Sequence, residues 1–83
     1  MENFSKAIEA NPKHAEAYFQ RGTIFGSVRN DREAIQDYNE AIKINLEYAE
    51  AFYRRGISYD RLGNHVQAAQ DKAMARRLGY RSL

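Results

Sequence analysis

The chain repeats itself after 34 residues, and this period constrains its fold more than any other feature. The segment Ala15–Phe25, AEAYFQRGTIF, returns as Ala49–Tyr59, AEAFYRRGISY. Identical residues continue at the same offset beyond these segments: Asn30/Asn64, Ala34/Ala68, Gln36/Gln70, Asp37/Asp71 and Ala41/Ala75. A fixed period without insertions predicts a supersecondary unit that stacks on its neighbour.

Within each unit the apolar residues recur at helical rather than strand spacing. In the first unit, one stripe runs through Ala15, Tyr18 and Phe25. The second half of the unit continues with Ala34 and Tyr38, four residues apart. Spacings of three and four place these side chains on one face of a helix. Each unit is therefore predicted to be helix–turn–helix.

Polar residues divide the two halves of each unit. Asn30 is predicted to cap the second helix, with Glu33 as its reciprocal partner three residues later. Asn64 occupies the equivalent place in the second unit. Gly63 suits the left-handed residue that ends a helix, whereas Arg29 replaces that glycine in the first unit.

The first fourteen residues fit the same period. A shift of 34 residues aligns Phe4 with Tyr38 and Ile8 with Ile42. These residues predict the second helix of a preceding unit. It should end at Asn11, because the residue before a proline avoids the α region.

The predicted organisation is one domain of helix–turn–helix units. Residues 1–14 form the second helix of a partial repeat, and residues 15–48 and 49–82 form two whole repeats. The fold class is therefore all-α, an α-solenoid of about five antiparallel helices.

Small residues at fixed positions predict close helix packing. Gly22 and Gly56 lie within helices, where glycine costs roughly 0.5–1 kcal/mol relative to alanine. This cost is tolerable where the missing side chain lets another helix approach. We expect Ala34 and Ala41 to face that approach and Tyr38 to fill the space beside it.

Composition excludes several classes of function. The chain has no cysteine, which rules out disulfides and thiolate chemistry. No apolar run is long enough to span a membrane, so we expect a cytoplasmic protein without membrane contact. The net charge is +2, and arginines at positions 76, 77 and 81 suit the negative end of a helix dipole. Nucleic acid is not an expected partner, because binding it requires a longer basic stripe.

Catalytic chemistry finds no support in the sequence. The two histidines, His14 and His65, belong to different units and share no carboxylate arrangement. There is no phosphate-binding glycine loop, Ser/His/Asp order or HExxH motif. We therefore predict no enzyme activity, no metal site and no cofactor.

The unit resembles the tetratricopeptide repeat (TPR), whose pattern is W-x2-L-G-x2-Y…A-x3-F…P. The matching residues of the first unit are Tyr18, Gly22, Phe25, Ala34 and Tyr38. Those of the second unit are Phe52, Gly56, Tyr59 and Ala68. The resemblance covers essentially the whole chain.

Several residues depart from the TPR pattern. Arg21 and Arg55 replace the leucine, and Leu46 and Tyr80 stand where the final proline is expected. Lys72 replaces the later aromatic, which suggests a terminal unit with a polar outer face.

The resemblance implies that the first helices of the repeats line a concave groove that binds a partner peptide or helix. Candidate groove residues lie between the packing positions: Phe19, Gln20, Thr23, Ser27, Tyr53, Arg54, Ile57, Asp60 and Arg61. Phe19 and Tyr53 are equivalent and would form an aromatic step. Arg54 and Arg61 would anchor a carboxylate or a peptide backbone. The two-carboxylate clamp of some family members is not predicted, because only Arg54 keeps a matching charge.

Each candidate also has a purely structural interpretation. Phe19 and Tyr53 would then be packing aromatics instead of binding residues. Arg54 would pair with Glu50 one turn earlier, and Asp60 with a nearby arginine. For Arg54 and Arg61 the solvated face is the favoured interpretation. The alternative function is self-association, as a homo-oligomer or a helix-swapped dimer, through the exposed apolar edge of the partial repeat.

Overall fold

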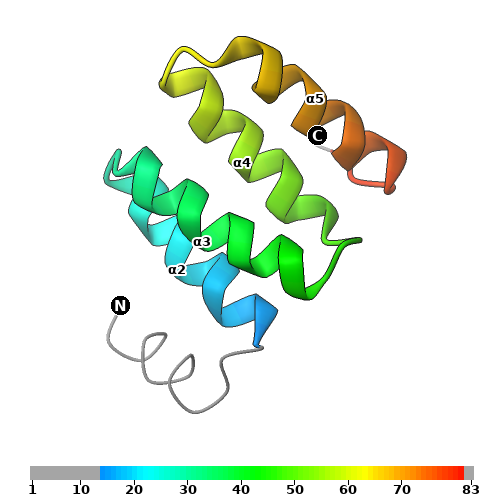
Figure 1. Cartoon of the computed structure of the whole chain (residues 1–83), viewed down its shortest axis with the longest axis horizontal. Coiled ribbons are helices and arrows are strands. Elements are labelled where there is room, and N and C mark those ends of the chain that lie inside the picture. Colours follow the sequence, from blue (N-terminus) through cyan, green and yellow to red (C-terminus); the bar gives the residue numbers. More distant parts are fainter. Residues whose placement is uncertain (1–13, 82–83) are drawn as a thin grey trace.

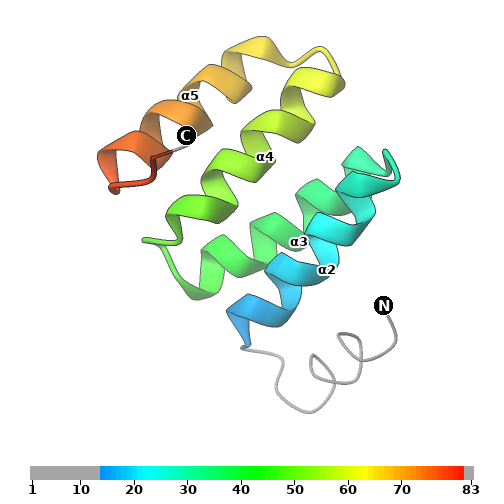
Figure 2. The same cartoon turned by 180° about the vertical axis from the view of Figure 1, so that it is seen from behind.

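The computed structural model describes residues 14–81, and this part of the chain contains four helices and no strand. They are α2 (Ala15–Ser27), α3 (Asp31–Ile44), α4 (Ala49–Arg61) and α5 (His65–Arg77). Consecutive helices run antiparallel, and α4 lies between α3 and α5 in both views (Figures 1 and 2). The predicted all-α solenoid of helix–turn–helix repeats is confirmed. The helix predicted over 1–14 falls outside the described residues, apart from His14.

Three of the helices end in the same hydrogen-bonded turn. After α2, the amide of Asn30 donates to the carbonyl of Phe25 at 2.8 Å. The residue between them, Arg29, is left-handed with φ +64°. Gly63 after α4 and Gly79 after α5 hold the same place, with φ +86° and +97°. The predicted left-handed role of Gly63 is confirmed, and Arg29 adopts that conformation without being glycine.

The predicted capping box is wrong, although Asn30 and Asn64 do occupy the N-cap positions of α3 and α5. Within residues 14–81, neither asparagine side chain hydrogen-bonds its helix. A capping box needs the backbone amide of the N-cap residue as donor to the side chain at Glu33. The amide of Asn30 is instead bonded to Phe25 of the preceding helix. The amide of Asn30 therefore bonds within the short turn and is not available to the side chain of Glu33.

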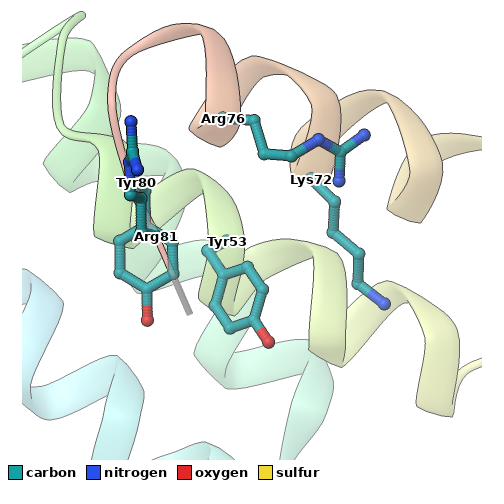
Figure 3. A pocket seen from close by; sticks show the side chains of 5 residues that line it. All are labelled: Tyr53, Lys72, Arg76, Tyr80 and Arg81. Carbon is teal, nitrogen blue, oxygen red and sulfur yellow. The ribbon is translucent and has the colours of Figure 1, made fainter. Parts of the chain in front are cut away.

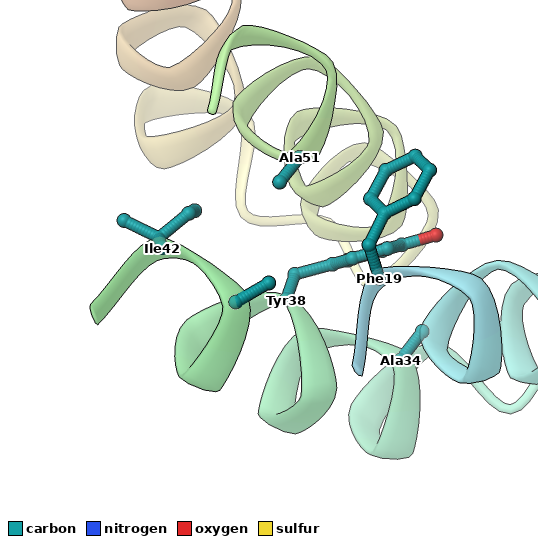
Figure 4. Close-up of a cluster of buried hydrophobic side chains, with 6 residues drawn as sticks. Phe19, Ala34, Tyr38, Ile42 and Ala51 are labelled. Carbon is teal, nitrogen blue, oxygen red and sulfur yellow. The ribbon is translucent and has the colours of Figure 1, made fainter. Parts of the chain in front are cut away.

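The core lies where α2, α3 and α4 meet. Its buried members are Phe19, Ala34, Tyr38, Ala41, Ile42 and Ala51. Figure 4 shows Ala51 of α4 opposite Tyr38 and Ile42 of α3. The expected packing of Ala34 and Ala41 is confirmed, because both are fully buried.

Glycine permits the close contact between α2 and α3. A Cβ atom added at Gly22 would lie 2.9 Å from a ring carbon of Tyr38. The equivalent atom at Gly56 would lie 3.1 Å from the carbonyl oxygen of Ala68. Both distances are shorter than ordinary van der Waals contact, so both glycines serve the predicted close approach.

Each repeat also contains a bidentate ion pair between its two helices. Arg21 donates to the two carboxylate oxygens of Asp37 at 2.8 and 2.7 Å, and Arg55 donates to Asp71 at 2.8 Å twice. Both aspartates are buried, and the hydrogen bond to each raises the pKa of its arginine. Arg55 also donates to Asn39 of the first repeat at 2.9 Å. These pairs fix the packing of α2 on α3 and of α4 on α5.

No helix among the described residues is both long and apolar enough to cross a bilayer.

Candidate functional site

Five of the nine predicted groove residues line one cleft between the two repeats. This inter-repeat cleft has a volume of about 100 Å³. Its lining comes from α2, α3 and α4: Thr23, Gly26, Ser27, Tyr38, Arg54, Ile57, Ser58 and Arg61. On α4 the spacing 54, 57, 58 and 61 follows one face of the helix, which explains why these side chains converge.

Arg61 joins the two repeats at one end of the cleft. It donates to the carbonyl oxygen of Gly26 at 2.8 Å and to Asp31 at 3.1 Å. Ser58 donates to the same carboxylate oxygen of Asp31 at 3.0 Å, and both Ser58 and Asp31 are buried. Arg61 is exposed, as the solvated-face interpretation predicted, but these contacts also hold its guanidinium in place. It does hold a carboxylate, but that carboxylate belongs to the chain itself.

Hydroxyl groups line the wall formed by α2 and α3. The phenol of Tyr38 donates to Thr23 at 3.3 Å, and Thr23 donates to the carbonyl of Phe19 at 2.9 Å. Ser27 donates to the carbonyl of Ile24 at 2.7 Å. Burial raises the pKa of Tyr38, so its phenol remains protonated at neutral pH. This wall can accept hydrogen bonds from a peptide, and Ile57 opposite gives an apolar contact.

Arg54 is the least constrained polar group in the cleft. Its nearest carboxylate is Glu50, with a separation of 3.9 Å between nitrogen and oxygen. The predicted pair with Glu50 is thus present but loose. The Nε atom of Arg54 is buried and has no hydrogen-bond partner among the described residues. An unsatisfied buried donor is destabilising, so the guanidinium gains stability from any acceptor that reaches it.

The other predicted groove residues lie outside this cleft. Phe19 is only 9% exposed and packs in the core against Tyr38 and Tyr48, with ring centroids 5.7 and 5.0 Å away. Gln20 donates to Glu16 on its own helix at 3.0 Å. Phe19 therefore has the packing role of its structural interpretation. Its ring contacts within residues 14–81 are with Tyr38 and Tyr48, so the predicted aromatic step with Tyr53 is not supported.

Asp60 is held by two basic groups rather than by the arginine expected from the sequence. Lys72 donates to one carboxylate oxygen at 2.5 Å, and His65 lies 2.8 Å from the other. These hydrogen bonds, that of Lys72 foremost, lower the pKa of Asp60. The carboxylate is thus occupied and does not reach the cleft.

Tyr53 stacks on Tyr80 with ring centroids 4.6 Å apart. The two rings line a separate pocket with a volume of about 450 Å³, shared with Lys72, Arg76 and Arg81 (Figure 3). Tyr53 thus contributes to a second concave region rather than to the cleft.

The sequence analysis missed Tyr38, Ser58 and Gly26 as cleft residues. Ser58 could have been found, because it lies four residues after Arg54 on the same helical face. Tyr38 was assigned only to packing, although its hydroxyl end reaches the cleft while its ring fills the core. Gly26 contributes a backbone carbonyl, which no pattern of side chains would reveal.

Two family models match the chain. The model described as "TPR repeat" matches residues 30–63, and the one described as "Tetratricopeptide repeat" matches residues 3–36. No curated protein sequence matches the chain at a significant level.

Solved structures with the same fold include MamA and YrrB. A crystal structure of MamA is 28% identical, with a TM-score of 0.89 over 94% of this chain and 46% of that one. YrrB, described as a TPR protein with an unusual peptide-binding site, is also 28% identical, with a TM-score of 0.90. That match covers 95% of this chain and 41% of YrrB. The chain thus spans less than half the length of either structure.

Proposed function

This chain belongs to the tetratricopeptide repeat family, and from that premise we propose that it is a non-catalytic interaction module that binds a peptide in the inter-repeat cleft. The observation that carries the proposal is the convergence of five predicted groove residues on this one cleft: Thr23, Ser27, Arg54, Ile57 and Arg61. YrrB, which shares the fold, is described as having a peptide-binding site. That description supports a peptide as the class of ligand here.

Within the cleft, Arg54 is the residue expected to hold the peptide. Its Nε donor is unsatisfied and its contact with Glu50 is long, so little is lost when the side chain turns toward a ligand. A backbone carbonyl or a carboxylate of the peptide supplies the missing acceptor. Ile57 then packs on an adjacent apolar side chain, which gives the site one polar and one apolar contact.

Arg61 has a different role in this proposal. Its hydrogen bonds to Gly26 and Asp31 fix the distance between the two repeats. The cleft is therefore preorganised, and less conformational entropy is lost on binding.

The proposal is tested with peptides of about twelve residues, selected on the whole chain from a displayed library and titrated by fluorescence anisotropy. We expect Arg54→Gln to weaken binding about tenfold, because one charge-assisted hydrogen bond is lost. Ile57→Ala should weaken it by a smaller factor. The matched control is Arg32→Gln, which removes the same charge from an exposed position on α3.

Equal affinity of the parent, Arg54→Gln and Ile57→Ala for every selected peptide would contradict the proposal. Amide chemical shifts of Thr23 and Ser27 give a second measurement, because both should move on titration. Circular dichroism of each variant establishes that it is folded.

Self-association and a cytoplasmic location stay predictions. The apolar edge expected to mediate self-association lies in residues 1–13, outside the described part of the chain. Sedimentation over a series of concentrations tests it, and a monomer at the highest concentration would exclude it.

A further inference from the structure

The pocket lined by Tyr53, Lys72, Arg76, Tyr80 and Arg81, here called the C-terminal pocket, lies on an open surface at the end of the described repeats (Figure 3). Lys72 and Arg76 come from α5, Tyr53 comes from α4, and the remaining two residues follow α5. Its volume of about 450 Å³ is more than four times that of the inter-repeat cleft.

The 34-residue period identifies the equivalent surface of the first repeat, whose packing is known. Tyr53, Lys72 and Arg76 are equivalent to the three residues of the first repeat that pack beneath α4: Phe19, Tyr38 and Ile42. In the first repeat these side chains form one buried cluster with Ala51 of α4 (Figure 4). The C-terminal pocket therefore has the architecture of a helix-docking surface.

Its chemistry differs from that of the first repeat. Lys72 is already neutralised by Asp60. Arg76 and Arg81 are exposed, and neither has an ion-pair partner among residues 14–81. An apolar helix laid over this surface would bury unpaired cations at a high cost. A helix that carries carboxylates would satisfy them through charge-assisted hydrogen bonds.

The stacked rings of Tyr53 and Tyr80 supply the apolar part of the same surface. Aromatic rings bury a large area with little loss of side-chain entropy, which makes them suitable anchors for a partner. We propose that the C-terminal pocket binds an acidic helix of a partner protein, with carboxylates on Arg76 and Arg81 and an apolar side chain on the tyrosine pair.

The test titrates the whole chain with a labelled helical peptide of about four turns. The peptide carries glutamates and leucines along one face, and a second peptide has glutamine in place of every glutamate. We expect the glutamate peptide to bind at least about tenfold more tightly than the glutamine peptide, with affinity that falls as salt is added.

The double variant Arg76→Gln, Arg81→Gln should lose about tenfold in affinity for the glutamate peptide. The matched control is Arg77→Gln, Arg32→Gln, which removes the same charge from exposed residues outside the pocket. Arg77 lies beside Arg76 in the last turn of α5, so both double variants remove one arginine from that helix end. The control should bind like the parent.

Three results would overturn the proposal. They are equal binding of the glutamine peptide, unchanged binding by the Arg76→Gln, Arg81→Gln variant, and equal binding of a single-stranded oligothymidine of the same charge. Arg54→Gln separates this site from the inter-repeat cleft. It should leave the affinity for the glutamate peptide unchanged, and a loss there would assign the peptide to the cleft instead.

Discussion

Both repeats are built from two helices, but they differ in the surface that faces the next helix along the chain. In the first, Phe19, Tyr38 and Ile42 form an apolar surface that α4 covers. The equivalent residues of the second repeat are Tyr53, Lys72 and Arg76. They line an open pocket instead of a core.

This difference shows that contacts within a repeat and contacts with the next helix constrain the sequence differently. Several residues that hold the two helices of a repeat together are the same in both copies, as with the glycine at 22 and 56 and the arginine at 21 and 55. The residues that meet the following helix are free to differ, because their partner differs. The departures from the repeat therefore mark the surfaces where function can reside.

The largest expected effect comes from truncating the two equivalent aromatics. Phe19→Ala should lower the free energy of unfolding by about 3–4 kcal/mol, because it leaves a cavity between Tyr38 and Tyr48. Tyr53→Ala should lower it by about 1 kcal/mol or less, since Tyr53 is half-buried and its stacking on Tyr80 is partly open to solvent. Urea unfolding of the two variants measures both.

Equal losses at the two positions would contradict this view of the repeats. The result would mean that the second surface is covered in solution as completely as the first. Tyr53→Phe serves as a control for the hydroxyl group, and it should unfold within about 0.5 kcal/mol of the parent.

The second largest effect is expected at the arginine–aspartate pair, which is the same in both repeats. Arg21→Gln and Arg55→Gln each leave a buried aspartate without its bidentate partner. We expect both to lower the free energy of unfolding by about 2–3 kcal/mol, less than for a fully buried pair because the arginines are partly exposed. The exposed Arg32→Gln gives the baseline for loss of a charge. A loss below about 0.5 kcal/mol at either site would exclude the ion pair as a structural element.

The fold was predictable from the sequence because its period is long and uninterrupted. The spacing of the apolar residues located all four described helices, and Gly63 identified a helix end. The arginine–aspartate pairs were missed, although both members recur at the 34-residue period. Their separation of 16 residues lies across the turn, so only the packed helices show that they meet.

The candidate site was less predictable because the groove residues were chosen as those between the packing positions. That choice treats the two first helices alike, yet Phe19 is buried beside Tyr48 of the linking segment, whereas Tyr53 stacks on Tyr80 and stays half-buried. Asp60 was expected to pair with a nearby arginine, and Lys72 was given no partner, yet the two pair with each other. Side-chain partners across helices require the geometry of the packed repeat.

A smaller effect is expected from adding a methyl group at the two helix-packing glycines. Gly22→Ala should lower the free energy of unfolding by about 1–2 kcal/mol, because overpacking against the buried ring of Tyr38 exceeds the gain in helix propensity. Gly56→Ala should also be destabilising but cost somewhat less, because its nearest contact, 3.1 Å to the backbone carbonyl oxygen of Ala68, is longer than the 2.9 Å at Gly22. Thermal unfolding compares the two, and a more stable Gly22→Ala would show that the ring of Tyr38 moves freely.

The smallest effect distinguishes the turns of the two repeats. Arg29 adopts φ +64°, a left-handed conformation that is costly for a residue with a Cβ atom, whereas Gly63 holds the equivalent place without strain. Arg29→Gly should therefore raise the free energy of unfolding by about 0.5–1 kcal/mol, and Gly63→Ala should lower it by about 1 kcal/mol. Arg29→Ala is the control, because it removes the charge while keeping the strain and should unfold like the parent. If Arg29→Ala is as stabilising as Arg29→Gly, the charge and not the backbone conformation is the unfavourable feature of this turn.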